Sequence, residues 1–433
     1  MIARKDKGRT VIVGLDGVPY GVIKHLTDTG LMKNLVHIIE GGVFRQMGSS
    51  IPEISSIAWS SIITGKNPGE HGIYGFMDLT PGTYRLFFPN FFNLKSSPFW
   101  NIENNKRSII INVPSTYPAR ELNGVLISGF VALNINKAVY PPELVPKLME
   151  MDYQIDVDSN KAHKSMDFFL KDLDKTLKSR IKAYRYLWDS QEEWDTFMLV
   201  FTGTDRLFHF LWNAYENTTH KYHEIVLDHF RQIDMAIGEI LDRMDDNDTL
   251  VLLSDHGFEA LDVEVNINYY LKENGFLALK DGKEDNFKNI DSSTKAFALD
   301  PSRVYVNLQG KYPAGSVKPE DKGRVIEDLI SLFESLQIDH RKVIKTIFRS
   351  QEIYYGPYFD QAPDLVLLSN KGLNLRANIK AKNLFDKGVF TGKHSQENAF
   401  LIVKGRENDD IVPDMPTVAD IVTIKDKLNL KRS

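Results

Sequence analysis

The chain has 433 residues, 42% of them hydrophobic and 26% charged, so it can bury a large core and is longer than one compact domain usually is. A formal charge of −5 and a pI near 6.2 give no overall positive field for a nucleic-acid backbone, and we expect no nucleic-acid polymer as a partner. The absence of cysteine excludes disulfides, thiolate metal sites and a cysteine nucleophile. Any metal ion must be held by His, Asp, Glu or hydroxyl groups.

The N-terminal segment, "MIARKDKGRTVIVGLDG", leads from charged residues directly into a short strand-like run. A signal peptide would have a longer apolar segment followed by small residues, so none is expected. No run of about 18 apolar residues offers a membrane-spanning helix. We predict a cytoplasmic protein without a membrane span, and the sequence leaves its oligomeric state open.

Short apolar segments alternate with amphipathic stretches along the chain, a pattern typical of an α/β sheet with helices on both faces. The apolar segments are almost continuous, as expected for a mostly parallel sheet whose strands are covered on both sides. The predicted strands are 10–16, 108–114, 124–130, 195–203, 248–255, 364–369 and 399–405, and the predicted long helices are 164–190, 217–246, 319–337 and 416–428.

Three segments interrupt this alternation. Residues 76–107 and 131–163 are rich in Pro, Asn and aromatic residues, and residues 259–391 form a long insertion before "GKHSQENAFLIVKG" returns to a core strand. We expect the insertion to be a cap or side region and the two shorter segments to be lid loops. The α/β core that carries the functional site would then comprise residues 1–258 and 392–433.

Two predicted strands end in acidic residues, at the edge of the sheet where functional groups gather in such folds. Asp16 is followed by Gly17, and Asp255 is followed by His256 and Gly257. An Asp-Gly pair is more often a plain turn, and Asp255 beside His256 could be a capping residue next to a buried histidine. An adjacent carboxylate and imidazole would equally suit Zn²⁺ or Mn²⁺.

A further pair occurs in "VFTGTDRLFHFLW", where Asp205 and His209 are four residues apart after a strand. If a helix begins there with Thr204 as its N-cap, the two side chains lie on one face and can bind one ion. The interleaved Leu and aromatic residues leave open that His209 is a core histidine. His394, in a Gly-flanked loop, "FTGKHSQENAF", indicates little by itself.

A second group of histidines has helical spacing without such a context. His220, His223 and His229 lie in "TTHKYHEIVLDHF", where no strand end or glycine turn presents them. We interpret this group as a solvated helix face and not as a metal site.

The stretch from Ile51 to Ile73, "IPEISSIAWSSIITGKNPGEHGI", predicts a helix that begins at Ser55 or Ser56 and ends before Gly65. The free N–H groups and dipole of a helix N-terminus favour anionic groups such as phosphate. A serine in this turn is therefore placed for chemistry, although it could be only an N-cap. Local sequence does not distinguish Ser55 from Ser56.

Taken together, the motifs resemble the alkaline phosphatase superfamily, most closely the type I phosphodiesterase/nucleotide pyrophosphatase family in its microbial members. The resemblance rests on Asp16-Gly17, a hydroxyl nine residues before the "TG" that begins at Thr64, "TDRLFH", "SDHG" and a late "GKH", in that order. "INVPSTYPARELNGVLISGF", "RVYVNLQG" and "APDLVL" extend it over most of the chain. It implies an alkaline-phosphatase-like fold and a hydrolase of small-molecule phosphate esters, first of all a phosphodiesterase or nucleotide pyrophosphatase, that acts through a phosphoseryl intermediate.

The resemblance also implies two divalent metal ions, usually zinc, with manganese as the alternative. It selects Ser55 as the nucleophile that touches the metals, because Ser55 and not Ser56 is nine residues before Thr64. Matched residue by residue, one ion would be held by Asp205, His209 and His394, and the other by Asp16, Asp255 and His256.

Two departures from the family pattern keep other functions open. The nucleophile is serine where these pyrophosphatases commonly have threonine, and Phe76 stands where they have a phosphate-binding asparagine. A phosphomonoesterase or a phosphoglycerate-mutase-like phosphotransferase could use the same site, and so could a catalytically inactive, metal-stabilised binding protein. Three basic residues near the motifs could supply positive charge to the site, but we interpret them as exposed: Lys66, Arg206 and Lys393.

Overall fold

A computed structural model describes residues 8–103, 105–191 and 193–431 of the chain, which divide into two compact units. The first contains the described parts of Met1–Lys66, Asn90–Phe258 and Phe390–Ser433, and the second contains Asn67–Pro89 and Glu259–Val389. Residues 1–7, on which the expectation of no signal peptide partly depends, lie outside the described residues. No described helix has the length and hydropathy needed to cross a bilayer.

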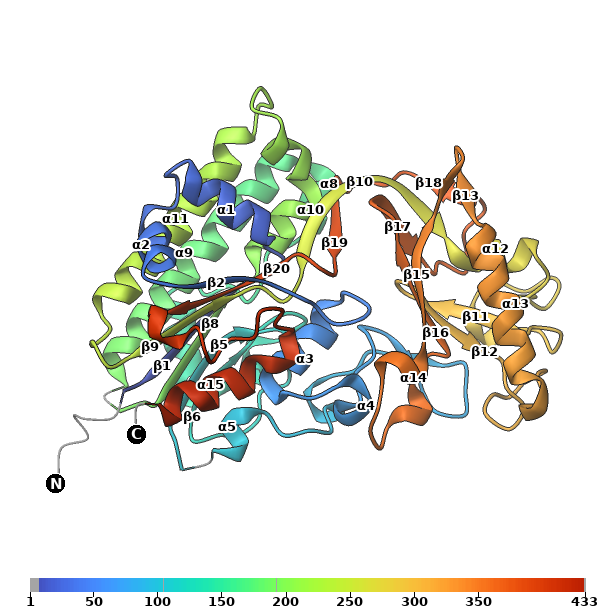
Figure 1. Cartoon of the computed structure of the whole chain (residues 1–433), viewed down its shortest axis with the longest axis horizontal. Coiled ribbons are helices and arrows are strands. Elements are labelled where there is room, and N and C mark those ends of the chain that lie inside the picture. Colours follow the sequence, from blue (N-terminus) through green and yellow to red (C-terminus); the bar gives the residue numbers. More distant parts are fainter. Residues whose placement is uncertain (1–7, 104, 192, 432–433) are drawn as a thin grey trace. The chain divides into compact units, whose positions relative to one another are not determined.

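The first unit is built on an eight-stranded sheet with the order β2-β20-β9-β1-β8-β5-β6-β7 (Figure 1). Its five neighbouring strands from β9 to β6 are parallel, and every pair that involves β2, β20 or β7 is antiparallel. The mostly parallel α/β fold predicted from the sequence is confirmed. The strands are β1 (Thr10–Leu15), β2 (Gly42–Met47), β5 (Ser108–Val113), β6 (Gly124–Ser128), β7 (Val139–Tyr140), β8 (Thr196–Phe201), β9 (Thr249–Leu253) and β20 (Ala399–Lys404).

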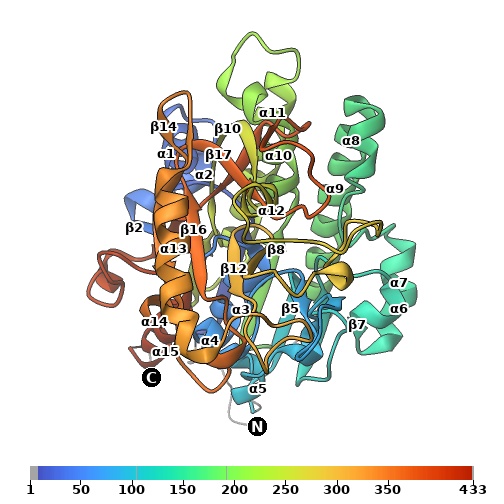
Figure 2. The same cartoon turned by 90° about the vertical axis from the view of Figure 1, so that its right-hand side faces the viewer.

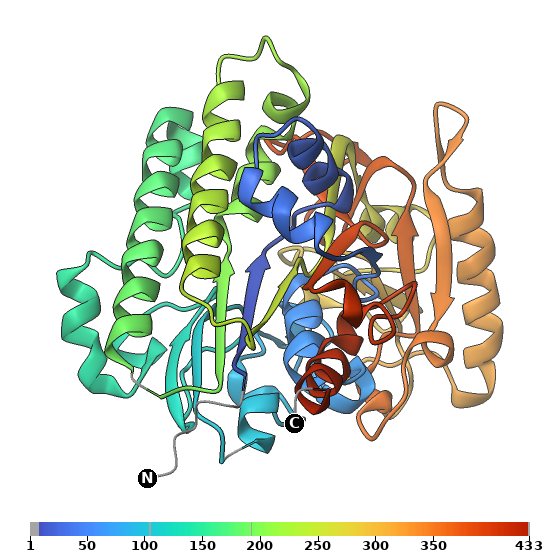
Figure 3. The same ribbon diagram turned by 60° about the vertical axis from the view of Figure 1, so that its left-hand side comes forward.

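Helices cover both faces of this sheet (Figures 1 and 3). Five pack together on one face, and two others contact each other on the opposite face. The first group is α1 (Tyr20–Asp28), α2 (Lys33–Glu40), α9 (Met166–Ser190), α10 (Gly203–Glu216) and α11 (His223–Asp242); the second is α3 (Ser55–Thr64) and α15 (Ile421–Leu430).

The predicted helices are present, but two of them begin clearly later than predicted. The helix predicted from residue 416 begins at Ile421, after a 3-10 turn over Val418–Asp420. The helix predicted from residue 217 begins at His223, because the Asn217 side chain accepts hydrogen bonds from the backbone N–H and hydroxyl of Thr219. Such a local bond offers the backbone an alternative to the first helical turn. The segments predicted as lid loops contain short elements: α5 (Phe99–Ile102), α6 (Ile135–Ala138), α7 (Val145–Glu150), α8 (Asn160–Lys164), β3 (Asp78–Leu79) and β4 (Leu86–Phe87).

The second unit has its own hydrophobic core. The helix α13 (Lys322–Ser335) contacts two strands of a four-stranded antiparallel sheet (Figure 2). Phe297, Leu329 and Phe333 are among the buried residues of this core. The sheet consists of β11 (Ala296–Leu299), β12 (Arg303–Val306), β16 (Leu365–Ser369) and β15 (Ile344–Arg349), and another sheet joins β17 (Gly372–Arg376), β10 (Gly257–Asn266) and β18 (Phe385–Asp386).

The interpretation of the α11 histidines as a solvated face is wrong for His229. Its side chain is buried, because it shares the inward face of α11 with Val226, Phe230 and Ile233 at helical spacing. Burial lowers the pKa of His229 to about 4, and its Nε2 has no hydrogen-bond partner among the described residues. The neutral form of His229 therefore belongs to the folded state.

This burial predicts a specific loss of stability in acid. Between the unfolded pKa of about 6.5 and the folded value of about 4, the unfolded chain binds the proton and the folded chain does not. The free energy of unfolding should therefore decrease as the pH is lowered, by about 2 kcal/mol between pH 7.5 and pH 5. In urea denaturation, His229→Gln should lack this pH-dependent loss of stability. His25→Gln, which changes an exposed histidine, should keep it. If His229→Gln and the wild type had the same pH dependence, the loss could not be assigned to His229.

Candidate active site

Three neighbouring parallel strands bring acidic residues to one edge of the sheet. In the register of the sheet Leu15 of β1 lies beside Phe201 of β8, and Gly14 lies beside Leu253 of β9, so the three strands end together. Asp16 directly follows β1, and Asp255 follows β9 after one residue. Asp205 lies in the first turn of α10, the helix after β8. The adjacency of the strands therefore determines that these three carboxylates meet.

Local backbone chemistry holds this edge together. Gly17 has a φ of +70°, and a Cβ on it would lie 2.9 Å from Phe258 and 3.1 Å from His256, so only glycine fits here. Its N–H donates to Asp255 Oδ1 at 3.0 Å. The Thr204 hydroxyl donates to the carbonyl of Asp16 at 2.6 Å; Thr204 is inside α10 and is not the N-cap that the sequence predicted.

The first candidate metal group consists of Asp205 and His209 of α10 together with His394. Asp205 Oδ1 lies 3.4 Å from His209 Nε2 and 3.1 Å from His394 Nε2, and the two Nε2 atoms are 3.0 Å apart. His394 belongs to the short strand β19 (Gly392–Ser395), not to a loop, and its Nδ1 is 2.9 Å from the carbonyl oxygen of Glu53. This contact orients the ring, so that its Nε2 faces Asp205.

The second candidate metal group is fully buried and consists of Asp16, Asp255 and His256. His256 Nε2 lies 3.3 Å from Asp255 Oδ2 and 3.7 Å from Asp16 Oδ1. Trp59 of α3 donates from Nε1 to the other oxygen of Asp16 at 3.2 Å. Asp16 Oδ1 and Asp255 Oδ2 have no hydrogen-bond partner among the described residues, although both atoms are buried.

The two groups adjoin, and Ser55 lies beside them. His256 Nε2 is 3.9 Å from Asp205 Oδ1, and the rings of His256 and His394 stack with centroids 3.7 Å apart. Ser55 Oγ is 3.0 Å from His256 Nε2. Ile54 occupies the N-cap position of α3, so Ser55 lies in the first helical turn and is not a cap. The structure thus brings all seven predicted site residues to one place.

Burial and mutual repulsion disfavour the charged forms in the second group. Burial, followed by the charges of Asp255 and Asp205, raises the pKa of Asp16 well above its usual range. Burial also raises the pKa of Asp255 to about 7 and lowers that of His256 to about 3. Neighbouring carboxylates without a positive partner are costly in a protein interior.

In the first group, positive neighbours oppose the effect of burial on the pKa of the carboxyl group. Burial alone would raise the pKa of Asp205, but His209, the hydrogen bond with His394 and the guanidinium of Arg206 hold it well below its usual range. Burial lowers the pKa of His209 to about 3. For His394, burial opposes protonation, but the hydrogen bond to Asp205 and the charge of that residue raise the pKa.

The donor atoms of both groups fit divalent cations. In each group the three donor atoms lie within 4.8 Å of one another. Buried carboxylate oxygens without a donor and imidazoles held in the neutral form are the usual ligands of zinc, and manganese accepts the same atoms. A cation would also remove the repulsion between the carboxylates, which the described side chains do not do for Asp16 and Asp255.

The interpretation of the nearby basic residues as exposed is wrong in two of three cases. Lys66 is exposed, but Lys393 is buried, and Arg206 is largely buried between two carboxylates. Arg206 Nη1 pairs with Asp205 Oδ2 at 2.6 Å, and its Nη2 pairs with Asp156 Oδ2 at 2.9 Å. In the sequence, only the position of Arg206 next to Asp205 indicates that this arginine belongs to the site. Nothing in the sequence indicates that Asp156 does.

With this geometry in view, comparison with known proteins identifies the class of protein. The profile of the family described as "Type I phosphodiesterase / nucleotide pyrophosphatase" matches residues 10–397. The chain is therefore an enzyme of the phosphoester hydrolase class within the alkaline phosphatase superfamily. It belongs to the type I phosphodiesterase/nucleotide pyrophosphatase family. No curated protein has a sequence that matches it.

Solved structures with low sequence identity share the fold. Phosphonoacetate hydrolase from Sinorhizobium meliloti 1021, in complex with phosphonoacetate, matches with a TM-score of 0.65 at 14% identity, over 99% of this chain and 96% of that chain. Murine ectonucleotide pyrophosphatase/phosphodiesterase 5 matches with a TM-score of 0.57 at 12% identity, over 98% and 95%. These likenesses establish the alkaline-phosphatase-like fold of this chain.

A glycine in β1 determines how closely α3 approaches the sheet. A Cβ on Gly14 would lie 2.4 Å from Trp59, the residue whose indole N–H donates to Asp16. Gly14→Ala should therefore displace Trp59 and reduce the free energy of unfolding by about 1–3 kcal/mol. The matched control is Gly21→Ala in α1, where a Cβ would contact nothing within 4 Å.

Urea denaturation measures this difference, and the near-UV circular dichroism of the tryptophans reports the displacement. An unchanged unfolding midpoint and spectrum for Gly14→Ala would contradict the packing described for Trp59.

Proposed function

We propose that this chain hydrolyses small-molecule phosphodiesters with Ser55 as nucleophile, at a site that holds two divalent metal ions. The observation that carries the proposal is the position of the Ser55 hydroxyl, 3.0 Å from His256, beside two groups of carboxylates and imidazoles. The second of these groups has two unpaired buried oxygens, Asp16 Oδ1 and Asp255 Oδ2. Family membership supports the class of reaction. A hydroxyl with no ligand groups around it would support only a structural serine.

Asp205, His209 and His394 would hold one ion, and Asp16, Asp255 and His256 would hold the other. Bound zinc ions would favour ionisation of the serine hydroxyl and stabilise negative charge that develops on the phosphoryl oxygens. Nitrogen and carboxylate donors favour zinc, and manganese is the alternative. The three carboxylates would offset most of the charge of two such ions.

The protein contributes a preorganised nucleophile. Ser55 lies in the first turn of α3, where the helix dipole and free N–H groups favour the anionic phosphoryl group. Attack by Ser55 Oγ on phosphorus would form the Ser–O–P bond as the bond to the leaving oxygen breaks. Water would then hydrolyse the phosphoseryl ester and restore the hydroxyl. Two successive in-line displacements give net retention at phosphorus.

A phosphomonoesterase or phosphotransferase is the second candidate, because the proposed nucleophile is serine. Among the described residues, however, the only arginine that contacts a site carboxylate is already paired. Arg206 is held between Asp205 and Asp156 and is not free to bind a dianionic phosphate. We therefore favour the diester, which carries a single charge. Faster hydrolysis of 4-nitrophenyl phosphate than of bis(4-nitrophenyl) phosphate by the zinc-loaded enzyme would reverse this preference.

Ser55→Ala should reduce kcat for a chromogenic diester by at least about 10³-fold, because it removes the attacking oxygen. Ser56→Ala, which changes the adjacent buried hydroxyl, is the matched control and should retain activity within about tenfold. Both variants should bind metal as the wild type does. Undiminished turnover by Ser55→Ala would exclude the proposed nucleophile.

The metal content should divide between the two groups. Elemental analysis of the wild type after dialysis against zinc should find about two ions per chain, as the two ligand groups predict. Asp205→Asn and Asp255→Asn should each retain about one, and Asp189→Asn, which removes an exposed pairing with Arg243, should retain both. A wild-type chain without bound zinc or manganese would contradict the dinuclear site.

The contact between Arg206 and Asp156 should affect the zinc affinity of the Asp205 group, because Arg206 also pairs with Asp205. Asp156→Asn removes the negative charge that pairs with Arg206, and so weakens the contact that holds Arg206 in place to orient the Asp205 carboxylate. We expect zinc affinity at the Asp205 group to fall about 10-fold, a typical effect of removing a partner of a ligand. Competition with a chromogenic chelator measures this, and an affinity equal to that of Asp189→Asn would show that the contact has no such role.

A further inference from the structure

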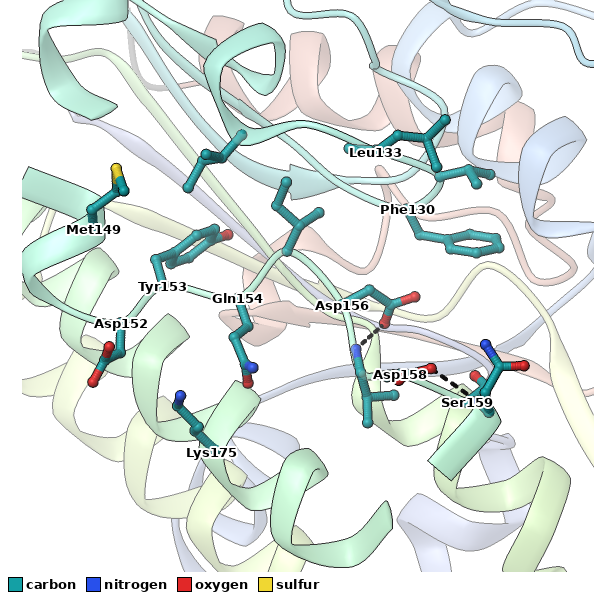
Figure 4. A pocket seen from close by; sticks show the side chains of 16 residues that line it. Phe130, Leu133, Met149, Asp152, Tyr153, Gln154, Asp156, Asp158, Ser159 and Lys175 are labelled. Carbon is teal, nitrogen blue, oxygen red and sulfur yellow. Dashed lines mark hydrogen bonds between the residues drawn. The ribbon is translucent and has the colours of Figure 1, made fainter. Parts of the chain in front are cut away.

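The first unit contains a cavity of about 810 Å³ (Figure 4). Two of its lining residues contact Arg206: the guanidinium lies 4.0 Å from the ring centroid of Phe130, and its Nη2 is 2.9 Å from Asp156. The same guanidinium pairs with Asp205 at 2.6 Å. One arginine side chain therefore separates the cavity wall from a carboxylate of the active site.

Most of the cavity lining is apolar. Three of its apolar side chains are largely exposed to solvent: Leu133 is 85% exposed, Met149 62% and Val131 47%. Phe130 and Tyr153 face the same space (Figure 4). A concave apolar surface that remains open to water is typical of a binding site.

The ionisable groups of the lining limit what can bind. They are three carboxylates, Asp152, Asp156 and Asp158, and one ammonium group, that of Lys175. Arg206 offsets the charge of Asp156, which leaves two carboxylates and one cation. A second phosphate group, as in a nucleoside diphosphate, would meet no excess of positive charge here and would be repelled. A neutral apolar group meets no such penalty.

We propose that this cavity binds an apolar substituent of the substrate, so that the preferred substrates are phosphodiesters in which one ester group is an alkyl chain or similar hydrocarbon. The proposal rests on the function proposed above, because it requires the phosphoryl group to bind beside Ser55. It adds a specificity site formed by residues 130–133 and 152–160 together with Ile135, Met149 and Lys175. Arg206 connects this site to the active site. No nucleobase or second phosphate is required for binding.

Alkylphosphonates test the proposal, since they carry a phosphoryl group and one chain that the enzyme cannot hydrolyse as an ester. Inhibition of bis(4-nitrophenyl) phosphate hydrolysis by methyl-, butyl- and octylphosphonate should strengthen with chain length. Each buried methylene adds up to about fourfold in affinity, so octylphosphonate should bind at least about 30-fold more tightly than methylphosphonate. A constant inhibition constant along the series would overturn the proposal.

Variants locate the effect. Leu133→Asp combined with Met149→Asp should reduce the octyl-to-methyl ratio to less than about threefold. Met235→Asp is the matched control, because Met235 is an exposed methionine of α11 with 69% exposure and lies outside the cavity. Both substituted positions are exposed, so circular dichroism should show folded chains. A double variant that keeps the wild-type ratio would overturn the assignment to this cavity.

Calorimetric titration of the zinc-loaded enzyme with the same phosphonates separates this proposal from the proposed function. Absence of phosphate-ester hydrolysis would contradict the function, whereas chain-length-dependent binding would still support the apolar cavity. Normal diester hydrolysis with tighter binding of ADP than of octylphosphonate would contradict the cavity proposal alone.

Discussion

The candidate site depends on one constraint, which is the parallel pairing of β1 with β8 on one side and β9 on the other. Because these strands end in the same register, Asp16, Asp205 and Asp255 meet at a single edge of the sheet. The helix α3 reaches this edge only because Gly14 leaves space for Trp59 against β1. A shift of one residue in either strand pair would turn alternate side chains to the opposite face and separate the carboxylates.

The same arrangement makes the site costly to the folded chain. Two carboxylate oxygens are buried without a partner, and burial raises the pKa values of Asp16 and Asp255. Native structures rarely leave such groups unpaired, and those that do are commonly binding or catalytic sites. Arg206 provides one internal counter-charge, and it contacts Phe130 and Asp156 in the wall of the neighbouring cavity. The charge balance of the site and the wall of the cavity are thus physically connected through Arg206.

Several features could not be predicted because their cause is long-range packing. His229 has the polar neighbours of a solvated helix, yet the face of α11 that contains it is the buried one. The sequence predicts exposed side chains for Arg206 and Lys393, since lysine and arginine are mostly exposed in proteins, but Arg206 is largely buried and Lys393 is buried. Asp156 could not be associated with the site at all, since it is 49 residues from Asp205 and lies in a segment without regular sequence periodicity.

The sequence by itself determined the elements and the candidates. Apolar runs and helical spacing indicated the core strands and long helices, and short motifs at strand ends, together with family resemblance, indicated the seven site residues. Their roles as ligands and nucleophile stay a proposal. Only the tertiary structure decided which carboxylates lack a partner, that Ser55 contacts His256, and that an apolar cavity adjoins the site. The physical reason is that motifs record local backbone requirements, whereas burial, charge balance and cavities arise from contacts between segments far apart in the chain.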